Sequence, residues 1–381
     1  LYNLAKGTIS LDSLIDSTAE VKRADGTTEV LGLTAEQIAD FIEGYYNEGR
    51  EFGDGLMYTM PLNKSTEVLY YDKTFFEANN LSVPTTWDEM WDTCEKILAI
   101  DPDCYPLGYD AEDNWFITLC EQMETGYTSA ENGGEYLFNN DANKAFVKEL
   151  REYYQKGYFT TQELYGSYTS NLFVETTDTR CYMCVGSSGG ASYQIPENRA
   201  FEVGVAPIPQ VSADNQKVIS QGPSLCIFQK ENPQEVIASW LFVKYLTTTV
   251  EFQADFSRAS GYVPVIQSVN QDEVYAQFLE KADGGSYLPA LSTKMALAQA
   301  DAYFVSPAFN GSSEARDQVG NIITKALPAA NIDSVIDDIF QESLVVLMQK
   351  VKSGSVVSSR EGALFSYLVQ IGKLTACNMV R

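Results

Sequence analysis

The chain has 381 residues, 45% of them hydrophobic and 20% charged, which is ordinary for a globular protein long enough to form two domains. Lys and Arg number 26 against 52 Asp and Glu, so the formal net charge is −26. Such a surface repels phosphate backbones and argues against nucleic acid as a partner, although a local site can still bind a small anion. The sequence has no apolar run of about 18 residues that would span a membrane.

Histidine is absent, which rules out a Ser-His-Asp or Cys-His centre within this chain and removes the commonest metal ligand. Of the seven cysteines, Cys181 and Cys184 have the spacing of a metal or redox pair. Their surroundings are typical of a strand, on which they would point to opposite faces, and no second such pair is present. We therefore expect buried free thiols, no metal site and no cofactor.

The first predicted elements precede residue 60. Ala35–Glu48 has apolar residues at helical spacing, and Thr34 is its expected N-cap. The following stretch, Phe52–Thr59, is predicted to be a strand.

A strand–helix–helix unit follows. Glu67–Tyr71 has the β-branched and aromatic content of a strand, and Asp72 is the expected cap of a short helix. Thr86 and Glu89 form the pattern of a capping box at the start of a second helix, Trp87–Ile100.

Strands and helices alternate through most of the remaining chain, without internal repeats. This order predicts an α/β protein with largely parallel sheets. The further predicted strands are Cys104–Tyr109, Cys181–Val185, Glu202–Ala206 and Val218–Phe228. The further predicted helices are Trp115–Met123, Ala142–Lys156, Thr169–Glu175, Gln234–Thr247, Glu273–Lys281, Met295–Tyr303, Ser313–Leu327, Ser334–Lys352 and Arg360–Lys373.

One long string carries a family resemblance. P-L-N-K-S-T-E-V-L-Y-Y-D-K-T-F-F-E, followed by V-P-T-T-W-D-E-M, closely resembles the extracellular solute-binding proteins of carbohydrate-type ABC importers. Within that family it is most similar to the members that bind glycerol-3-phosphate. The match is long and ordered, and therefore far more specific than a short motif.

The resemblance implies a two-lobe, type II periplasmic-binding-protein fold that closes like a clamshell. We expect lobe one to comprise residues 1–108 plus 227–304, and lobe two residues 109–226 plus 305–381. The hinge crossovers are then expected near 105–112, 222–228 and 303–312. Residues 1–16 resemble a later segment of the family, so the chain is expected to lack the family's first strand–helix–strand unit.

Three residues that match family ligand contacts lie at strand ends or turns. Ser65 precedes a predicted strand, although a turn hydroxyl bonded to its own backbone is the simpler reading. Ser187 opens S-S-G-G, a turn that can offer amides and hydroxyls to an anion. Gly222 fits a close backbone approach to a ligand, or else an ordinary bulge.

Three further matches carry larger side chains. The Tyr262 hydroxyl could donate to a ligand, or its ring could belong to the core. Arg316 suits bidentate phosphate binding, or a surface pair with Glu314 or Asp317. Trp115 matches a tryptophan that stacks on the ligand, with core packing as the alternative. The G-S-S-E-A-R string around Arg316 differs from the family pattern, and the family's remaining tyrosine and glutamate contacts fall before Leu1.

Together these residues predict a binding protein and not an enzyme. We expect a monomeric, extracytoplasmic subunit, periplasmic or lipid-anchored at the outer face of the membrane in a Gram-positive bacterium. It would capture glycerol-3-phosphate or a glycerophosphodiester by lobe closure and deliver it to the transmembrane subunits of an ABC permease.

Two alternatives stay open. The same fold could bind a neutral mono- or oligosaccharide, and the direction of Arg316 distinguishes the two ligands: facing the cleft favours an anion, and facing solvent favours a sugar. A glycosidase would need two carboxylates flanking one bond. Glu112, Asp113 and Glu121 are candidates, but acids are so plentiful in this chain that the pattern carries little weight.

Overall fold

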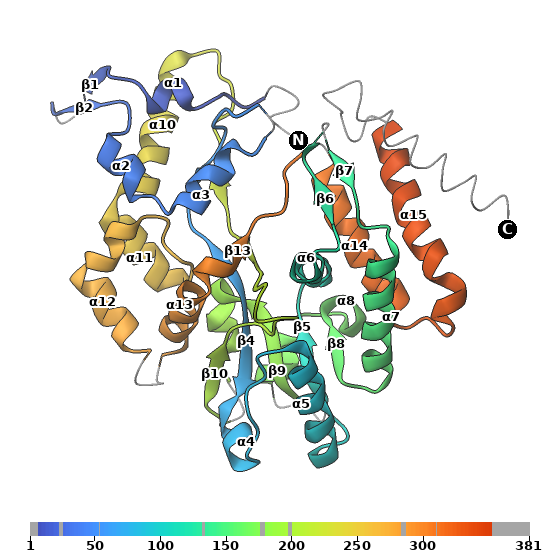
Figure 1. The fold of residues 1–381 in the computed structure, drawn as a ribbon. Coiled ribbons are helices and arrows are strands. Elements are labelled where there is room, and N and C mark those ends of the chain that lie inside the picture. The colour runs from blue at the N-terminus through green and yellow to red at the C-terminus, as the bar shows by residue number, and fades with distance from the viewer. Residues whose placement is uncertain are drawn as a thin grey trace.

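A seven-stranded sheet lies at the centre of the molecule, with strand β4 (Ser65–Asp72) in its middle (Figure 1). The computed structural model describes residues 7–22, 26–52, 54–131, 134–175, 180–196, 200–282, 287–309 and 311–352. The helix predicted over Arg360–Lys373 lies outside the described residues.

The sheet is mixed, with one strand running against all the others. Its order is β13 (Tyr303–Phe304), β11 (Val218–Gln221), β4, β9 (Cys181–Ser187), β5 (Tyr105–Tyr109) and β8 (Phe159–Thr161), while β10 (Val203–Ala206) also pairs with β4. Strand β4 is antiparallel to β9, β10 and β11, whereas the pairs β11–β13, β5–β9 and β5–β8 are parallel. All strands except β4 therefore share one direction, which agrees with the predicted mostly parallel α/β fold.

The predicted caps form around β4. Asp72 ends the strand and accepts the amide of Phe75 at 2.8 Å, which starts α4 (Lys73–Ala78). Thr86 and Glu89 form the expected capping box at the start of α5 (Trp87–Ile100). These local predictions are confirmed because each cap needs only neighbouring residues.

The molecule has two main hydrophobic cores, which we number in the order in which the chain enters them. The second core is the larger, and its residues fall between Leu69 and Leu344. A group of stacked aromatic rings, including Trp87, Trp91 and Trp115, lies within it. Its helices occupy the right and lower parts of Figure 1. They are α5, α6 (Glu112–Met123), α7 (Asp141–Gln155), α14 (Ser312–Ala326) and α15 (Ile332–Lys352). Near it lie α8 (Gln162–Tyr165), α9 (Ser170–Val174) and the hairpin of β6 (Thr128–Ser129) and β7 (Glu135–Tyr136).

The smaller first core comprises residues from Leu11 to Met60 and from Ile227 to Ala296, and its helices lie on the left side of Figure 1. These helices are α1 (Asp12–Ile15), α2 (Ala35–Asp40), α3 (Glu43–Asn47), α10 (Pro233–Thr248), α11 (Val250–Ser260), α12 (Glu273–Glu280) and α13 (Leu288–Ala298). The small strands are the pair β1 (Glu20–Lys22) and β2 (Thr28–Val30), and the pair β3 (Met60–Pro61) and β12 (Ser224–Leu225).

Three predicted elements in this part differ from the structure. The helix expected over Ala35–Glu48 breaks at Phe41, which is extended and forms a bridge with Ile266. The strand expected over Val218–Phe228 is interrupted at Gly222. The helix expected over Met295–Tyr303 begins already at Leu288, since the proline that follows suits a first helical turn.

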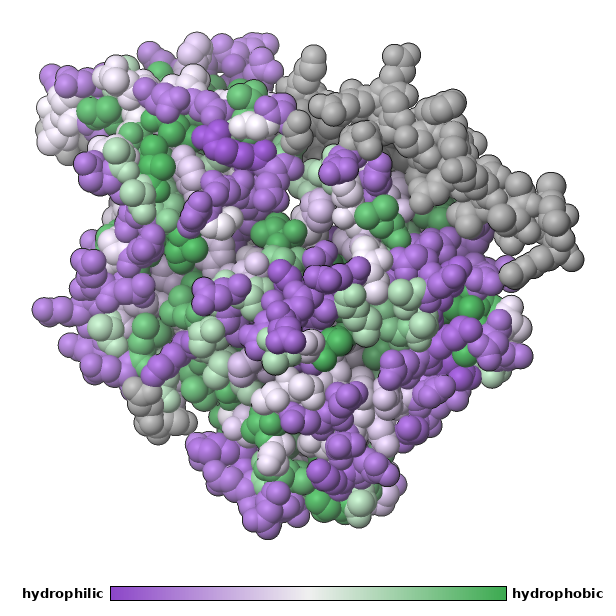
Figure 2. Space-filling view, viewed as in Figure 1, coloured by the Kyte–Doolittle hydropathy of each residue, from purple (hydrophilic) through white to green (hydrophobic). Residues whose placement is uncertain are grey.

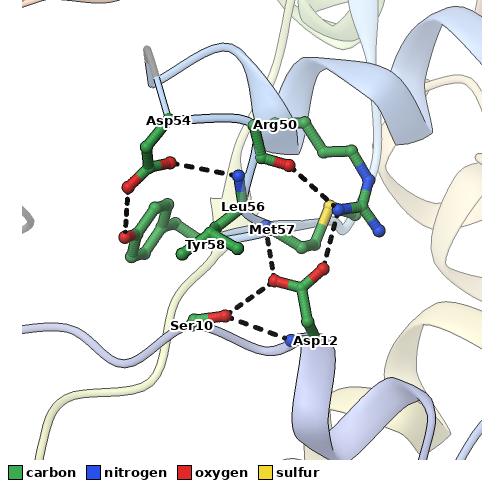
Figure 3. Close-up of polar contacts among 8 residues, drawn as sticks. Ser10, Asp12, Arg50, Asp54, Leu56, Met57 and Tyr58 are labelled. Carbon is green, nitrogen blue, oxygen red and sulfur yellow. Dashed lines mark hydrogen bonds and ion pairs between the residues drawn. The ribbon is translucent and has the colours of Figure 1, made fainter.

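The fourth difference is the segment 54–59, the described part of the strand expected over Phe52–Thr59, which forms a loop held by carboxylates (Figure 3). Asp12 accepts hydrogen bonds from Arg50 Nη1 at 2.7 Å and from the amide of Met57 at 2.9 Å. Asp54 accepts from the amide of Leu56 at 3.0 Å and from the Tyr58 hydroxyl at 2.7 Å. Asp54 binds donors two and four residues along the chain, in the way that turns compete with strand pairing, while Asp12 holds the loop from a distant part of the chain.

Over the described residues, the chain changes cores three times. The changes fall between Met60 and Leu69, between Ile219 and Ile227, and between Ala296 and Ala315. The second and third intervals include predicted crossovers, but the first lies well before the expected 105–112. Residues 69–108, expected in lobe one, pack in the second core because β4 and β5 both pair with β9. We therefore propose an earlier first crossover, and the lobe boundaries stay a prediction.

Helix α13 connects the first core to the central sheet. Leu291 on this helix packs against a third apolar cluster on β4, β9 and β10. The Tyr70 hydroxyl on β4 donates to the Ser187 carbonyl at 2.9 Å and lies 2.9 Å from the Ser292 hydroxyl. Ser292 in turn donates to the Ser188 carbonyl at 3.0 Å. A buried hydrogen-bonded contact thus fixes α13 to the end of β9.

The face shown in Figure 2 is mostly hydrophilic, with small apolar patches scattered over it. This agrees with the strongly acidic composition. Within the described ranges, no helix has the length and apolar character needed to cross a membrane.

Candidate ligand-binding site

A pocket of about 260 Å³ lies at the end of strand β11 of the central sheet. The end of β11, the segment 305–308 and the first turn of α14 form most of its wall, and Tyr127 closes one side. Ser220 and Gln221, at the end of β11, are held there because they pair with the first residues of β4. The pocket therefore lies where the chain passes between the two cores.

The first turn of α14 presents a polar helix end to this pocket. Ser312, Ser313 and Arg316 of α14 line it. The N-cap is Gly311, with φ of 101°, and no side chain caps the helix. An uncapped N-terminus carries partial positive charge and unsatisfied amides, both of which favour an anion.

Three buried hydroxyls on the pocket wall have no hydrogen-bond partner. They belong to Tyr127, Ser220 and Ser306. The Tyr127 side chain is only 2% exposed, and burial raises the pKa of its hydroxyl, which therefore remains a donor. Buried hydroxyls without partners are costly, so their shared position points to a polar ligand that would satisfy them.

Arg316 faces this pocket but is already paired. Its Nη2 donates to Asp113 Oδ2 at 2.7 Å and also to the side-chain oxygen of Asn114. Both partners lie in the first turn of α6, far from Arg316 in sequence. Glu314, one partner considered from the sequence, instead accepts a hydrogen bond from Gln318 at 2.8 Å. Arg316 thus offers a guanidinium to the pocket while Asp113 offsets its charge.

Glu67 is a polar residue that sequence reasoning missed. It lies on β4 near Arg316, Asp113 and Asn114, and it is 1% exposed. Its Oε2 accepts a hydrogen bond from the Tyr109 hydroxyl at 2.7 Å, while Oε1 has no partner. Burial raises the pKa of Glu67 to about 8, against the opposing effect of the hydrogen bond from Tyr109 and of the nearby Asn114 side chain. The sequence could have indicated this residue, because Glu67 is the one charged residue in the predicted strand Glu67–Tyr71.

Three predicted site residues gather at one end of β4, next to the pocket. Ser65 begins β4 and pairs with Gln221 of the pocket wall. Ser187 ends β9 opposite Glu67, and its hydroxyl accepts the amide of Gly189 at 3.2 Å. Tyr262 packs so closely on that glycine that a Cβ there would lie 2.9 Å from the ring. These residues are brought together, but they do not line the pocket itself.

Two predicted site residues serve the fold instead. Trp115 is 0% exposed and stacks on Tyr109, with ring centroids 4.3 Å apart and planes 5° apart. It cannot stack on a ligand in this conformation, because its indole is enclosed by the second core. Gly222 has φ of 118°, and a Cβ there would lie 2.4 Å from the Asn63 carbonyl oxygen. Its missing side chain accommodates the neighbouring backbone and not a ligand.

Cysteines and acidic residues form no further reactive centre in the ranges that the structure describes. Cys181 and Cys184 are both buried in the third apolar cluster as free thiols, and the Cys184 thiol lies 3.4 Å from the Thr169 hydroxyl. In those ranges, no three or more Cys, Asp or Glu side chains come together to hold a metal ion. Of the candidate acids, Glu112 accepts the amide of Glu163 at 2.8 Å, while Asp113 pairs with Arg316.

Two comparisons with solved structures match the fold. The chain superposes on UgpB from Mycobacterium tuberculosis in complex with glycerophosphocholine with a TM-score of 0.70, at 18% identity over 92% of this chain and 81% of that one. It superposes on maltose-bound MalE3 of T. maritima with a TM-score of 0.66, at 16% identity over 90% of this chain and 81% of that one. At these identities the likeness concerns the fold alone. It confirms the predicted two-lobe α/β fold.

Sequence comparisons point the same way. The sn-glycerol-3-phosphate-binding periplasmic protein UgpB of Rhizobium meliloti is 25% identical over 296 residues, which cover 74% of this chain and 65% of the relative. UgpB of Salmonella typhimurium is 25% identical over 279 residues, or 70% of this chain and 60% of the relative. The chain thus spans only about three fifths of the length of such relatives. The family model of the bacterial extracellular solute-binding protein matches residues 3–281. The chain therefore belongs to the bacterial extracellular solute-binding proteins, a family of binding proteins and not of enzymes.

Proposed function

We propose that this protein is the substrate-binding subunit of an ABC importer and that it captures a small polyol phosphate outside the cytoplasm. Glycerol-3-phosphate and glycerophosphodiesters are the ligands that fit best. The main observation that supports this proposal is the pocket, which combines Arg316, an uncapped helix N-terminus and buried hydroxyls without hydrogen-bond partners. The names of the UgpB relatives support the same class of ligand.

The pocket chemistry supports a phosphate group on physical grounds. A guanidinium and a helix N-terminus both stabilise negative charge, and hydroxyl donors such as Tyr127 complete the coordination of phosphate oxygens. The pocket volume of about 260 Å³ suits a solute of only a few carbon atoms. Ser65, Ser187 and Tyr262 lie at the neighbouring end of β4, and we propose that lobe closure brings them to the polyol part of the ligand.

Closure would follow from binding without catalysis. The pocket wall includes residues 305–308 of the third crossover interval, so we propose that a ligand bound there favours the closed arrangement of the two cores. Delivery to the transmembrane subunits of a permease, a monomeric state, and a lipid anchor or a periplasmic location are parts of the same proposal. Their support is the likeness to the extracellular solute-binding family and not the pocket.

A neutral sugar is the second candidate, and one observation favours it. Asp113 already neutralises Arg316, so the pocket has no free positive side-chain charge. Hydroxyl groups of a sugar could then satisfy Ser220, Ser306 and Tyr127 equally well. MalE3 shares the fold and is described with bound maltose.

The deciding experiment is a thermal-shift and calorimetric titration of the full-length protein with glycerol-3-phosphate, glycerophosphocholine and maltose. A ligand that binds the native state raises the unfolding midpoint by mass action. We expect shifts with the phosphates, and Arg316→Ala should weaken their binding by about tenfold to a hundredfold, the usual effect of losing a charged hydrogen bond.

The matched control is Arg258→Ala. Arg258 is also an arginine in an ion pair, with Asp255, but it lies on α11 away from this pocket. It should leave phosphate binding unchanged. A shift with maltose alone, or equal phosphate binding in Arg316→Ala, would overturn the assigned ligand class.

A further inference from the structure

We propose that the pocket selects a singly charged phosphodiester over a doubly charged phosphate monoester, that Asp113 sets this preference, and that the buried carboxyl group of Glu67 makes anion binding weaker at high pH. The inference rests on the proposed function, since it assumes a phosphate group at Arg316. Its basis is the balance of charge around that guanidinium and the burial of the groups that carry it.

The charge count around Arg316 leaves little room for a dianion. Arg316 is the positive side chain of the pocket wall, and its Nη2 is 2.7 Å from the Asp113 carboxylate. Glu314, in the first turn of α14, adds a second nearly buried carboxyl group. A monoanion would share Arg316 with Asp113, whereas the second charge of a dianion would meet no compensating cation.

The pocket is nevertheless built for a ligand rather than being an acidic cluster alone. The hydroxyl of Tyr127, on a side chain that is almost fully buried, lines the pocket and has no partner. The Ser220 hydroxyl is in the same situation. Neutral donors of this kind bind a phosphodiester oxygen without adding charge.

Glu67 does not line the pocket. It can affect the ligand only through Arg316 and Asp113, whose charges act on it, so it is a positioning residue. Tyr109 faces it from β5, Asp113 and Asn114 from α6, and Arg316 from α14. On β9 its partner is Ser187, which does not titrate. Its Oε1 has no partner, and burial keeps its pKa high enough for the carboxyl to be mostly uncharged at neutral pH.

Ionisation of Glu67 would add a negative charge to this group. Arg316 would then be shared between two protein carboxylates, and an anionic ligand would be bound more weakly. Affinity for a diester should therefore be constant from pH 6 to 7.5 and fall above about pH 8. A phosphate monoester has its second pKa near 6, so its affinity should rise as the pH falls toward 5 and it becomes a monoanion.

The experiment is isothermal titration calorimetry of the full-length protein with glycerophosphocholine and glycerol-3-phosphate at pH 5.5, 7.5 and 9. At pH 7.5 the diester should bind about tenfold more tightly than the monoester, the effect of one uncompensated charge near a protein surface. Asp113→Asn should reduce this preference because Arg316 becomes free for the second charge. Glu67→Gln should remove the loss of diester affinity at pH 9.

The control is Glu77→Gln, which changes an exposed carboxylate on α4. It should leave both pH profiles as they are. The wild-type profiles test the proposal even if a substituted protein does not fold. Equal or tighter binding of the monoester at pH 7.5 overturns the preference, and an unchanged profile in a folded Glu67→Gln overturns the role of Glu67. Binding of neither phosphate would instead overturn the proposed function.

Discussion

At the residue scale, the protonation of Glu67 couples the site to stability. A carboxyl group enclosed by Tyr109, Asn114 and the core is disfavoured as an anion, so folding favours its protonated form. Between its ordinary pKa of 4.5 and its folded pKa of about 8, the folded state binds a proton that the unfolded state has lost. Stability from this group therefore falls as the pH rises through that window.

This gives a prediction for unfolding by urea at pH 5, 7 and 8.5. The free energy of unfolding should fall more between pH 5 and 8.5 in the wild type than in Glu67→Gln, because glutamine carries no proton that folding takes up. The two proteins should differ in slope, whatever their stability at pH 5. Parallel curves would show that Glu67 does not bind a proton on folding.

At the scale of elements, the interruption of one expected strand determines which residues reach the pocket. The extended stretch expected over Val218–Phe228 becomes β11 and β12 because Gly222 turns the chain at φ of 118°. The turn places the end of β11 beside the start of β4 and leaves Ser220 at the pocket. Sequence reasoning assigned this glycine to ligand contact because a glycine needed for backbone approach looks the same whatever approaches it.

Gly222→Ala should therefore destabilise the protein by about 1–3 kcal/mol, from the positive φ and the overlap with the Asn63 carbonyl. The measurement is the midpoint of urea unfolding. The control is Gly44→Ala in α3, where a Cβ meets nothing within 4 Å, so the change should be neutral or stabilising. A loss of ligand binding without loss of stability in Gly222→Ala would instead restore the ligand-contact interpretation.

At the scale of the whole molecule, α13 connects the first core to strands β4 and β9 of the central sheet. The Tyr70 hydroxyl lies within hydrogen-bonding distance of both the Ser187 carbonyl and the Ser292 hydroxyl, and all three belong to buried or nearly buried positions. Ser187 is also one of the residues that we propose at the ligand. Movement of one core against the other would therefore act on the turn after β9.

Tyr70→Phe should lower the free energy of unfolding by about 1–3 kcal/mol, since it keeps the ring but leaves buried polar partners unsatisfied. The check is urea unfolding, with Tyr165→Phe as the control because that ring is exposed on α8. An unchanged midpoint in Tyr70→Phe would show that α13 is held by apolar packing alone.

The sequence by itself determined the local features and the family. The caps at Asp72 and Thr86 form because their hydrogen bonds reach only three residues along the chain. The α/β order and the long string from Pro61 onward identified a solute-binding protein. Of the residues predicted to contact the ligand, Arg316 lines the pocket, whereas Ser65 pairs with Gln221 of the pocket wall without lining the pocket itself.

Only the tertiary structure decided the rest, because it depends on residues that are distant along the chain. Arg316 meets Asp113 across 203 positions, and no local pattern specifies that pair. Trp115 is enclosed by rings from β5 and α5, so a residue expected at the ligand became part of the core. Glu67 acquires its raised pKa from burial under β5, α6 and α14, which sequence alone does not reveal.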